Sequence, residues 1–123
     1  MFTITKRFDF SAAHQLPDHD GKCKNLHGHN YYVEVDVQGP LHTAGPEHGM
    51  VVDLGILSGL AKGYCDVVDH KFLNDILDYS TAELIAKNVA DFFRGGLSSR
   101  EELTVSKVRV QETDSGWATY EPD

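Results

Sequence analysis

The sequence has few cysteines, few prolines and a shortage of positive charge. Its 123 residues include 2 cysteines and 4 prolines, and 19 Asp and Glu outnumber 11 Lys and Arg, for a formal net charge of −8. Nucleic-acid binding usually requires a basic face, so neither DNA nor RNA is an expected partner. No apolar run approaches the roughly 20 residues that a membrane span needs, and we expect no membrane association.

The N-terminal sequence MFTITKRFDF alternates apolar and polar residues and carries no apolar stretch suited to a secretion signal. Two cysteines, Cys23 and Cys65, allow a disulfide in principle, but a domain of this size does not need one. We therefore expect reduced thiols and a cytoplasmic protein. Apolar residues make up 41% and charged residues 24% of the chain. This composition is typical of a globular protein, and no repeat or linker divides residues 1–123, so one domain is expected.

Two segments alternate apolar and polar residues, which is the pattern of a strand with one buried face. In residues 2–12 one parity carries Phe2, Ile4, Phe8, Phe10 and Ala12. In residues 27–38 one parity carries Tyr31, Val33, Val35 and Val37. Residues 104–112 form a third predicted strand, and a turn at residues 114–116 leads into a short fourth strand, residues 117–120.

Two helices are expected between these pairs of strands. Asp53 is suited to cap the first helix, whose apolar residues at helical spacing are Leu54, Leu57, Leu60, Ala61 and Tyr64. Its glycines recur every fourth residue and indicate a helix face that packs closely against a neighbour: Gly55, Gly59 and Gly63. The second helix is expected to open with a capping box from Ser80 to Glu83 and to end at Gly95–Gly96.

The order strand, strand, helix, helix, strand, strand predicts an α+β fold, in which two helices cover one face of a four-stranded antiparallel sheet. The other face carries opposite charges on neighbouring strands, such as Arg7, Glu34 and Arg109, and suits water or a partner. Such a sheet has two open edges, which must be protected or paired with other subunits, so we expect a homo-oligomer.

His27 and His29 are two residues apart in a predicted strand, so both side chains project from the apolar, helix-covered face. His14 shares the parity of the apolar residues of the first strand, provided that this strand extends so far. Two adjacent strands then deliver three imidazoles to one pocket. Three neutral histidines leave zinc a fourth position for water or substrate, as in a catalytic site. The alternatives are a coincidental His-x-His pair and a closed structural site with Cys23 or His19 as the fourth ligand.

Three further features suit chemistry near that metal. Cys23 lies four residues before His27, and a thiol near zinc or basic groups is readily deprotonated; the alternative is an inert loop cysteine. Asp69 precedes His70 and can orient its ring and raise its pKa, although such pairs are common in loops. Glu112 has the parity of buried strand residues. A buried carboxylate is costly unless paired or bound, so Glu112 either anchors a ligand or reaches solvent at the strand end.

Three other histidines lie in turn-rich segments and are expected to be solvated: His19, His42 and His48. An anionic substrate would have to be met by the one basic cluster near the metal histidines, which comprises Lys6, Arg7, Lys22 and Lys24.

Six stretches of the sequence occur together in one order. They are FSAAHQL (10–16), CKNLHGHNY (23–31), GMVVDL (49–54), VDHKFLN (68–74), STAE (80–83) and QET (111–113). Together they resemble the family of 6-pyruvoyltetrahydropterin and 6-carboxytetrahydropterin synthases over nearly the whole chain. Leu54 and Val68 depart from this pattern by apolar exchanges only. The resemblance implies the tunnelling fold, in which such sheets join around an axis into a barrel, commonly as a hexamer with active sites at subunit interfaces.

The resemblance also implies roles for the residues of the site. Zinc would be held by His14, His27 and His29. Protons would be transferred by Cys23, Asp69 and His70. The pterin would be anchored by Glu112, which accepts hydrogen bonds from its amino and ring N–H groups, with contacts added by Thr81 or Thr113. The triphosphate of the substrate would be met by Lys22 and Lys24, an expectation that rests on their charge and position alone.

Within the family, the spacing Cys-x-x-x-His-Gly-His resembles the bacterial 6-carboxytetrahydropterin synthases of queuosine (7-deazaguanine) biosynthesis. Synthases of the animal type usually have a longer spacing, and Cys23 disfavours the branch in which glutamate replaces the cysteine. The expected activity is a zinc-dependent lyase that converts 7,8-dihydroneopterin triphosphate to 6-carboxy-5,6,7,8-tetrahydropterin, acetaldehyde and triphosphate. The alternatives are a 6-pyruvoyltetrahydropterin synthase, which cleaves no carbon–carbon bond, and a non-catalytic binding module with a structural zinc.

Overall fold

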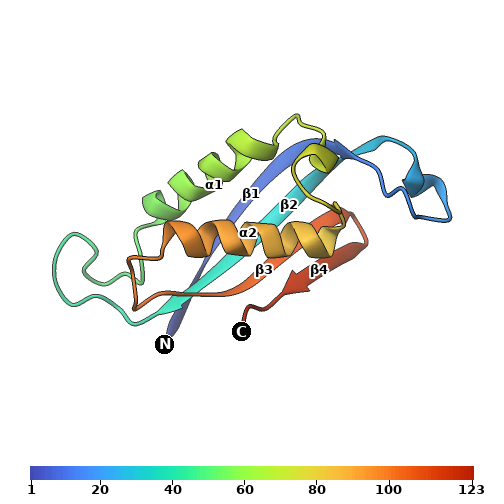
Figure 1. Ribbon diagram of the computed structural model, residues 1–123. Helices are drawn as coiled ribbons and strands as arrows, with labels where there is room; N and C mark the ends of the chain where they lie inside the picture. Colours follow the sequence, from blue (N-terminus) through green and yellow to red (C-terminus); the bar gives the residue numbers. More distant parts are fainter.

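The computed structural model describes residues 1–123 and has two layers, an antiparallel sheet and a pair of helices (Figure 1). The sheet consists, in spatial order, of β1 (Phe2–His14), β2 (His27–Gly39), β3 (Thr104–Thr113) and β4 (Gly116–Tyr120). The helices are α1 (Leu54–Val68) and α2 (Ala82–Gly96), and single 3-10 turns are Lys22–Lys24 and Leu73–Asp75. The predicted α+β fold with the order ββααββ is therefore confirmed. No helix has the length and apolar character that crossing a membrane requires.

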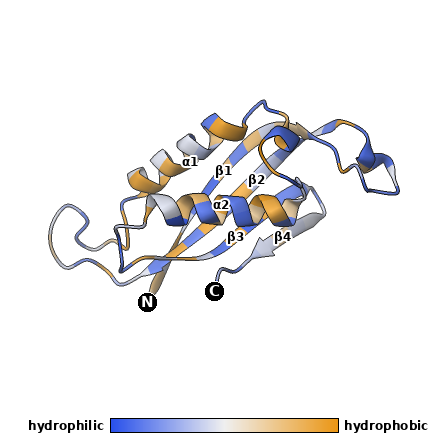
Figure 2. Cartoon of the chain, in the orientation of Figure 1, coloured by the Kyte–Doolittle hydropathy of each residue, from blue (hydrophilic) through white to orange (hydrophobic).

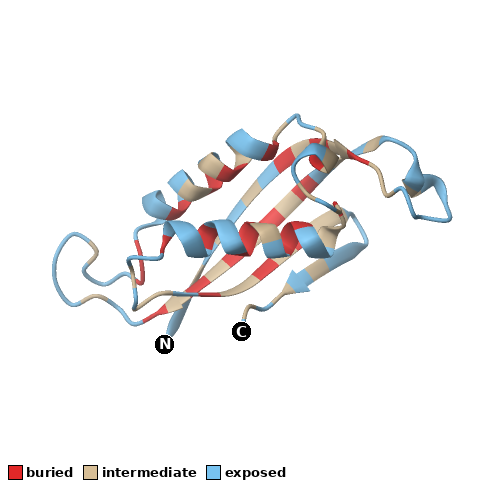
Figure 3. Ribbon diagram, viewed as in Figure 1, coloured by how far each residue is buried: buried red, intermediate tan, exposed pale blue.

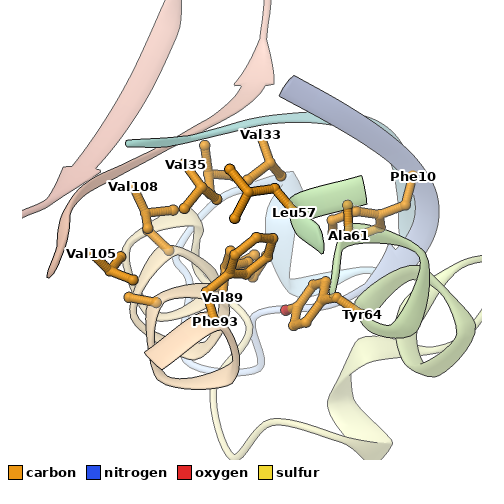
Figure 4. Packing of buried hydrophobic residues seen from close by; sticks show 14 of the residues in the cluster. Phe10, Val33, Val35, Leu57, Ala61, Tyr64, Val89, Phe93, Val105 and Val108 are labelled. Atoms are coloured by element: carbon orange, nitrogen blue, oxygen red, sulfur yellow. The ribbon is translucent and has the colours of Figure 1, made fainter. Parts of the chain in front are cut away.

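The core lies between the sheet and the two helices. Alternate residues of β2 are buried, as the sequence pattern predicts, and the same alternation is visible in the colours of Figures 2 and 3. In Figure 4, Val33 and Val35 of β2 face Leu57 of α1 and Phe93 of α2. These residues belong to a cluster of 22 buried hydrophobic side chains. Full burial of a valine or leucine side chain contributes about 1.5–3 kcal/mol, so this cluster is the main source of stability.

The two helix starts differ in how well the sequence predicted them. Asp53 caps α1, and its carboxylate accepts a hydrogen bond from Gly55 N at 2.9 Å, as expected. The capping box at Ser80 is wrong, because Thr81 caps α2 instead, with Oγ1 3.3 Å from Leu84 N. Ser80 is fully buried in front of the helix. Its hydroxyl donates to Asn74 Oδ1 at 3.2 Å, so this side chain is engaged in the interior and not at the helix start.

The regularly spaced glycines of α1 do not mark a close helix contact. A Cβ atom at Gly59 would meet nothing within 4 Å, and one at Gly63 would only touch the Phe92 ring at 3.4 Å. The close approach of the two helices lies at the end of α2, where a Cβ atom on Gly96 would overlap the side chain of Leu60. Spacing along one helix does not reveal where its partner crosses it, which is why the prediction fails.

One of the three histidines expected to be solvated is engaged in a polar network. Nδ1 of His42 lies 2.9 Å from the Met50 carbonyl oxygen and Nε2 lies 2.9 Å from Glu102 Oε2. These two acceptors raise the pKa of His42. Arg100 Nε donates to the same Glu102 oxygen at 3.1 Å, so the network ties the loop after β2 to the segment before β3. Solvent exposure is confirmed for the other two histidines, His19 and His48.

The segment after α1 runs beside the end of β1 and covers that edge of the sheet. His70 N donates to Ser11 O at 2.6 Å, and Ala13 N donates to Lys71 O at 3.0 Å. A parallel bridge between Ala13 and Phe72 continues the contact. The outer edge of β1 is thus covered near the end of the strand, and the open edges of the sheet are the start of β1 and the outer side of β4.

The sheet face opposite the helices is polar, as predicted. Arg7 pairs in register with Glu34, and Arg109 Nη1 lies 3.4 Å from Glu34 Oε1 on the other side. The guanidinium of Arg109 also lies 4.3 Å above the Trp117 ring. Charges of opposite sign are matched across three strands, so this face is compatible with water or with a partner of mixed charge.

Candidate metal centre

Three histidines meet where β1 ends and β2 begins. The register of these strands pairs His14 with His27 and Ala12 with His29, so the ladder itself gathers the side chains at one end of the sheet. The ring centroid of His14 lies 4.5 Å from that of His27 and 5.1 Å from that of His29, and the last two are 4.8 Å apart. His14 is fully buried, and the other two are half-buried. The structure therefore brings together the three histidines that the spacing singled out.

Two of the rings are held by backbone carbonyl groups. Nδ1 of His14 lies 2.8 Å from the Ser80 carbonyl oxygen, and Nδ1 of His27 lies 2.7 Å from that of Asn25. A carbonyl oxygen only accepts hydrogen bonds, so both Nδ1 atoms carry a proton in the neutral rings. The Nε2 lone pairs then face the centre of the group. Nε2 is buried in all three rings: that of His27 has no partner, and those of His14 and His29 face only the Glu112 carboxylate.

Glu112 reaches the same point from β3. Its Oε1 lies 2.8 Å from His29 Nε2 and 3.2 Å from His14 Nε2. One ligand atom from each of these residues and His27 forms a group whose members all lie within 4.8 Å of one another. The alternation of strand residues predicts that Glu112 lies on the buried face. It does not predict that the Glu112 carboxylate lies beside the three histidines, where a fourth position for water or substrate was expected.

Burial and charge set the protonation of this group. Burial lowers the pKa of His29, which favours the neutral ring that binds metals. Burial also opposes protonation of His14, but the Glu112 carboxylate and the Ser80 carbonyl outweigh it and raise the pKa of His14. The contact with His14 lowers the pKa of Glu112, so this carboxylate is ionised at neutral pH. A cation binding here would therefore compete with a proton on His14.

The four side chains fit a divalent transition metal. Imidazole nitrogens suit zinc, copper, iron and nickel, whereas magnesium and calcium prefer oxygen ligands. A buried nitrogen atom without a partner, such as Nε2 of His27, is rare in folded proteins, and a metal ion shared by the three rings would satisfy it. The donor set, the orientation of the rings and the charge of Glu112 agree with this interpretation.

Cys23 lies outside this group. It is half-buried in the turn Lys22–Lys24, where its carbonyl oxygen accepts a hydrogen bond from Leu16 N at 2.8 Å. His19 is also remote from the group, and its Nδ1 accepts from Gly21 N at 2.9 Å. Neither of the residues considered as a closing fourth ligand is therefore placed at the centre.

Asp69 and His70 form a pair beside β1. His70 Nδ1 lies 3.0 Å from Asp69 Oδ2, while Asp69 Oδ1 accepts from Ser11 N at 2.9 Å. The Ser11 N–H and the His70 ring lower the pKa of Asp69. The φ angle of His70 is 58°, in the left-handed region that residues with side chains rarely adopt and that is enriched at functional sites. No hydrogen bond or ion pair joins this pair to Cys23 within the chain.

Two recesses flank the histidines. One, of about 580 Å³, is lined by His29, His70 and Lys71 among others. The second, of about 270 Å³, is lined by Glu112 and Thr113 together with the first residues of α2. His70, one of the residues expected to transfer protons, and Glu112, expected to anchor a ligand, thus open onto different recesses of one chain.

The other expected contacts are less engaged. The Thr81 hydroxyl is occupied as the cap of α2, where it accepts from Leu84 N. Lys24 is exposed in its turn and forms no ion pair.

Sequence reasoning missed three features of the site. The carbonyl groups of Asn25 and Ser80 have no signal in sequence, because every residue carries a carbonyl. The third is the hydroxyl of Tyr31, whose ring lies 5.5 Å from that of His29 and whose oxygen is buried without a partner. Parity placed Tyr31 in the core correctly, but nothing pointed to its hydroxyl.

The two-layer fold with open sheet edges and the histidine cluster at one end define a tunnelling-fold protein with a site suited to a metal ion. Residues 3–123 match the family described as 6-pyruvoyl tetrahydropterin synthase, and the chain belongs to this family.

Two similar curated proteins are both named 6-carboxy-5,6,7,8-tetrahydropterin synthase. The chain is 32% identical to the 6-carboxy-5,6,7,8-tetrahydropterin synthase of Haemophilus influenzae over an alignment of 140 positions, gaps included. The alignment covers 98% of this chain and 99% of the relative. The chain is 45% identical to the synthase of that name from Synechocystis over 93 residues, 70% of each chain. Among solved structures, the 6-pyruvoyl tetrahydropterin synthase of Caenorhabditis elegans aligns with a TM-score of 0.83 at 30% identity, covering 99% of this chain and 96% of the other.

Proposed function

We propose that this protein is a zinc-dependent carbon–carbon lyase. It converts 7,8-dihydroneopterin triphosphate to 6-carboxy-5,6,7,8-tetrahydropterin, acetaldehyde and triphosphate, a step of queuosine and 7-deazapurine biosynthesis. The whole activity is assigned to one pterin-binding domain, residues 1–123, of a cytoplasmic protein.

One observation carries the proposal: three buried imidazole Nε2 atoms converge on one point together with the Glu112 carboxylate, and that of His27 has no other partner. The names of the two curated relatives, both 6-carboxy-5,6,7,8-tetrahydropterin synthases, support the choice of product. The spacing between Cys23 and His27 supports the same branch of the family.

Zinc is the metal that three histidines and one further position suit best. His14, His27 and His29 would hold it, with the charge of Glu112 beside them. When bound there, zinc supplies Lewis-acid stabilisation for negative charge that develops on the side-chain oxygens of the substrate.

The chain's own groups would move the protons. Asp69 holds the His70 ring by Nδ1, which leaves His70 Nε2 free to give or take a proton at the substrate. The Ser11 N–H fixes the carboxylate that orients this ring. Cys23 would be the partner base in this proton transfer.

A second copy of the chain is needed to complete this set. The Asp69–His70 pair lies beside the outer edge of β1, whereas Glu112 lies on β3, with β1 and β2 between them. Neighbouring strands are about 4.8 Å apart, so the backbones of pair and carboxylate are separated by roughly 14 Å across the sheet. A neighbouring subunit that packs against the open side of the site would bring its own pair to Cys23 and Glu112. We therefore propose a homo-oligomer, a hexamer, with active sites at the subunit interfaces.

The recess beside α2 is the proposed pterin pocket. Glu112 lines it and would accept hydrogen bonds from the amino and ring N–H groups of the pterin. Thr113 lines the same recess, and Thr81 lies at its helix start. The exposed ammonium group of Lys24 would meet the triphosphate, since no carboxylate neutralises it in the chain.

A 6-pyruvoyltetrahydropterin synthase is the second candidate, favoured by the similarity to the Caenorhabditis elegans structure. It would use the same substrate and the same metal site, and it would eliminate triphosphate without cleaving a carbon–carbon bond.

The test is to incubate the zinc-loaded protein with 7,8-dihydroneopterin triphosphate and to identify the pterin product by mass spectrometry. A carboxy-pterin together with acetaldehyde supports the lyase, and a pyruvoyl-pterin supports the second candidate. Absence of turnover with zinc bound would contradict both and favour a non-catalytic module.

A further inference from the structure

Asn74 links two segments that enclose His14. Its Nδ2 donates to the Gln15 carbonyl oxygen at 2.8 Å, and its Oδ1 accepts from Gln15 N at 3.0 Å. The same Oδ1 accepts from Ser80 Oγ at 3.2 Å. Three of the four hydrogen bonds that an amide side chain can form are therefore used within this small region.

These contacts surround the hydrogen bond that orients His14. Gln15 follows His14 directly at the end of β1, and Ser80 supplies the carbonyl oxygen 2.8 Å from His14 Nδ1. Both His14 and Ser80 are fully buried. The hydrogen bond between His14 Nδ1 and the Ser80 carbonyl is therefore held by Asn74 at both ends. Asn74 binds the backbone of Gln15, which follows the donor, and the side chain of Ser80, whose carbonyl is the acceptor.

We propose that Asn74 is a positioning residue of the metal site. Through Gln15 and Ser80 it holds the Nδ1–H of His14 on the Ser80 carbonyl, which keeps His14 Nε2 directed at the other two imidazoles. The inference rests on the metal site of the proposed function and adds the residue that maintains its geometry.

The physical reason is that Ser80 belongs to no regular element. It lies between the 3-10 turn Leu73–Asp75 and the start of α2 at Ala82, so no helix or strand ladder fixes its carbonyl. Hydrogen bonds from outer residues to metal-bound histidines set ring orientation, and their loss typically weakens metal binding by about 10- to 100-fold. In this site the acceptor for the His14 ring is the backbone carbonyl of Ser80. Its position therefore depends on Asn74, whose side chain holds the segment that contains Ser80.

The test compares zinc release from four loaded proteins: wild type, Asn74→Ala, Ser80→Ala and the double variant. Ser80→Ala removes the hydroxyl link to Asn74 but keeps the carbonyl acceptor. We expect Asn74→Ala to speed the release of zinc to a competing chelator by about 10- to 100-fold. Ser80→Ala should speed it by a smaller factor, and the double variant should release zinc no faster than Asn74→Ala alone, because both act through one link.

Asn88→Ala is the matched control. Asn88 accepts a hydrogen bond from Tyr64 OH at 2.9 Å, far along α2 from the histidines. It should lower the melting temperature while the rate of zinc release stays that of the wild type.

A second readout follows the proton on His14 Nδ1 by NMR in the zinc-loaded protein. In the wild type this proton should exchange slowly with solvent, and in Ser80→Ala and Asn74→Ala it should exchange faster. Wild-type release and wild-type exchange in both variants would overturn the inference and leave the metal site intact. If Asn74→Ala does not fold, Ser80→Ala decides by the same two measurements. A wild-type protein that takes up no zinc would instead contradict the proposed function.

Discussion

Replacing His27 by alanine should reduce the stabilisation of the fold by zinc. In the wild type, three Nε2 atoms and one carboxylate oxygen are available within 4.8 Å of one another. The substitution removes one of the three nitrogens and leaves the 22-residue core, which lies between sheet and helices, unchanged. The variant should therefore still fold, and the change should appear in the response to metal.

The size of the effect follows from linkage. With free zinc at 100 times the wild-type Kd, binding stabilises the folded state by about 2.7 kcal/mol. For a chain of this length, about 1 kcal/mol shifts Tm by roughly 3–5 °C, so zinc should raise the wild-type Tm by about 10 °C. Loss of an outer hydrogen bond alone costs about 10- to 100-fold in affinity, and loss of a ligand must cost at least as much. The stabilisation of His27→Ala at the same zinc concentration then falls to about 1.4 kcal/mol for a 10-fold loss of affinity and to about 0.4 kcal/mol for a 100-fold loss, shifts of about 6 °C and about 2 °C.

The assay is thermal unfolding followed by circular dichroism, with and without zinc at that concentration. His48→Ala serves as the control, because His48 is an exposed histidine in the loop after β2 and should keep the full zinc response. A zinc-dependent rise of about 10 °C in His27→Ala would refute the three-histidine site. Loss of the response in His48→Ala would show that zinc binds elsewhere.

Three further predictions concern catalysis and stability. Cys23→Ala should abolish pterin turnover while the protein retains its zinc, because Cys23 lies outside the metal group; normal turnover in this variant would exclude its role as a base. The pKa of His42 is raised above 6.5 in the fold, so its ion pair with Glu102 stabilises fully below pH 6.5 and is lost as the pH rises through the folded-state value. The difference in unfolding free energy between wild type and His42→Gln should accordingly be larger at pH 6 than at pH 9, and an equal difference would contradict this. Asp53→Ala should lower the unfolding free energy in urea by about 1 kcal/mol with an unchanged m value, since it removes the cap bonded to Gly55 N; no loss would mean that this cap contributes nothing.

The convergence of the three histidines was predictable because it depends on two short-range rules. A spacing of two residues in a strand fixes the common face of His27 and His29, and antiparallel pairing brings His14 opposite His27. Both rules follow from alternation and chain order, which a sequence displays directly. The same holds for the order of the elements along the chain and for the Asp53 cap.

The depth at which Glu112 enters the site was not predictable in this way. Parity assigns a face of the sheet, but the distance of 2.8 Å to His29 depends on the twist and register of three strands. The parts played by Ser80 and Asn74 depend on a loop whose path is set by tertiary contacts. Ser80 also illustrates a failure of local reasoning, because a suitable capping spacing was overridden by burial of the residue.

The contacts of one chain do not explain the expected role of Cys23. Its spacing to His27 suggests proximity to the metal, yet it lies outside the group of four in the structure. In the proposed oligomer a neighbouring subunit would bring the partners of Cys23, and neither spacing nor the contacts of one copy displays them.

X-ray absorption at the zinc edge of the loaded protein identifies the atoms bound to the metal. Zinc held by His14, His27 and His29 should show three nitrogen neighbours at about 2.0–2.1 Å, a further oxygen at a similar distance and no sulfur. A sulfur neighbour at about 2.3 Å would place Cys23 or Cys65 in the coordination sphere. It would contradict the three-histidine centre built on β1 and β2.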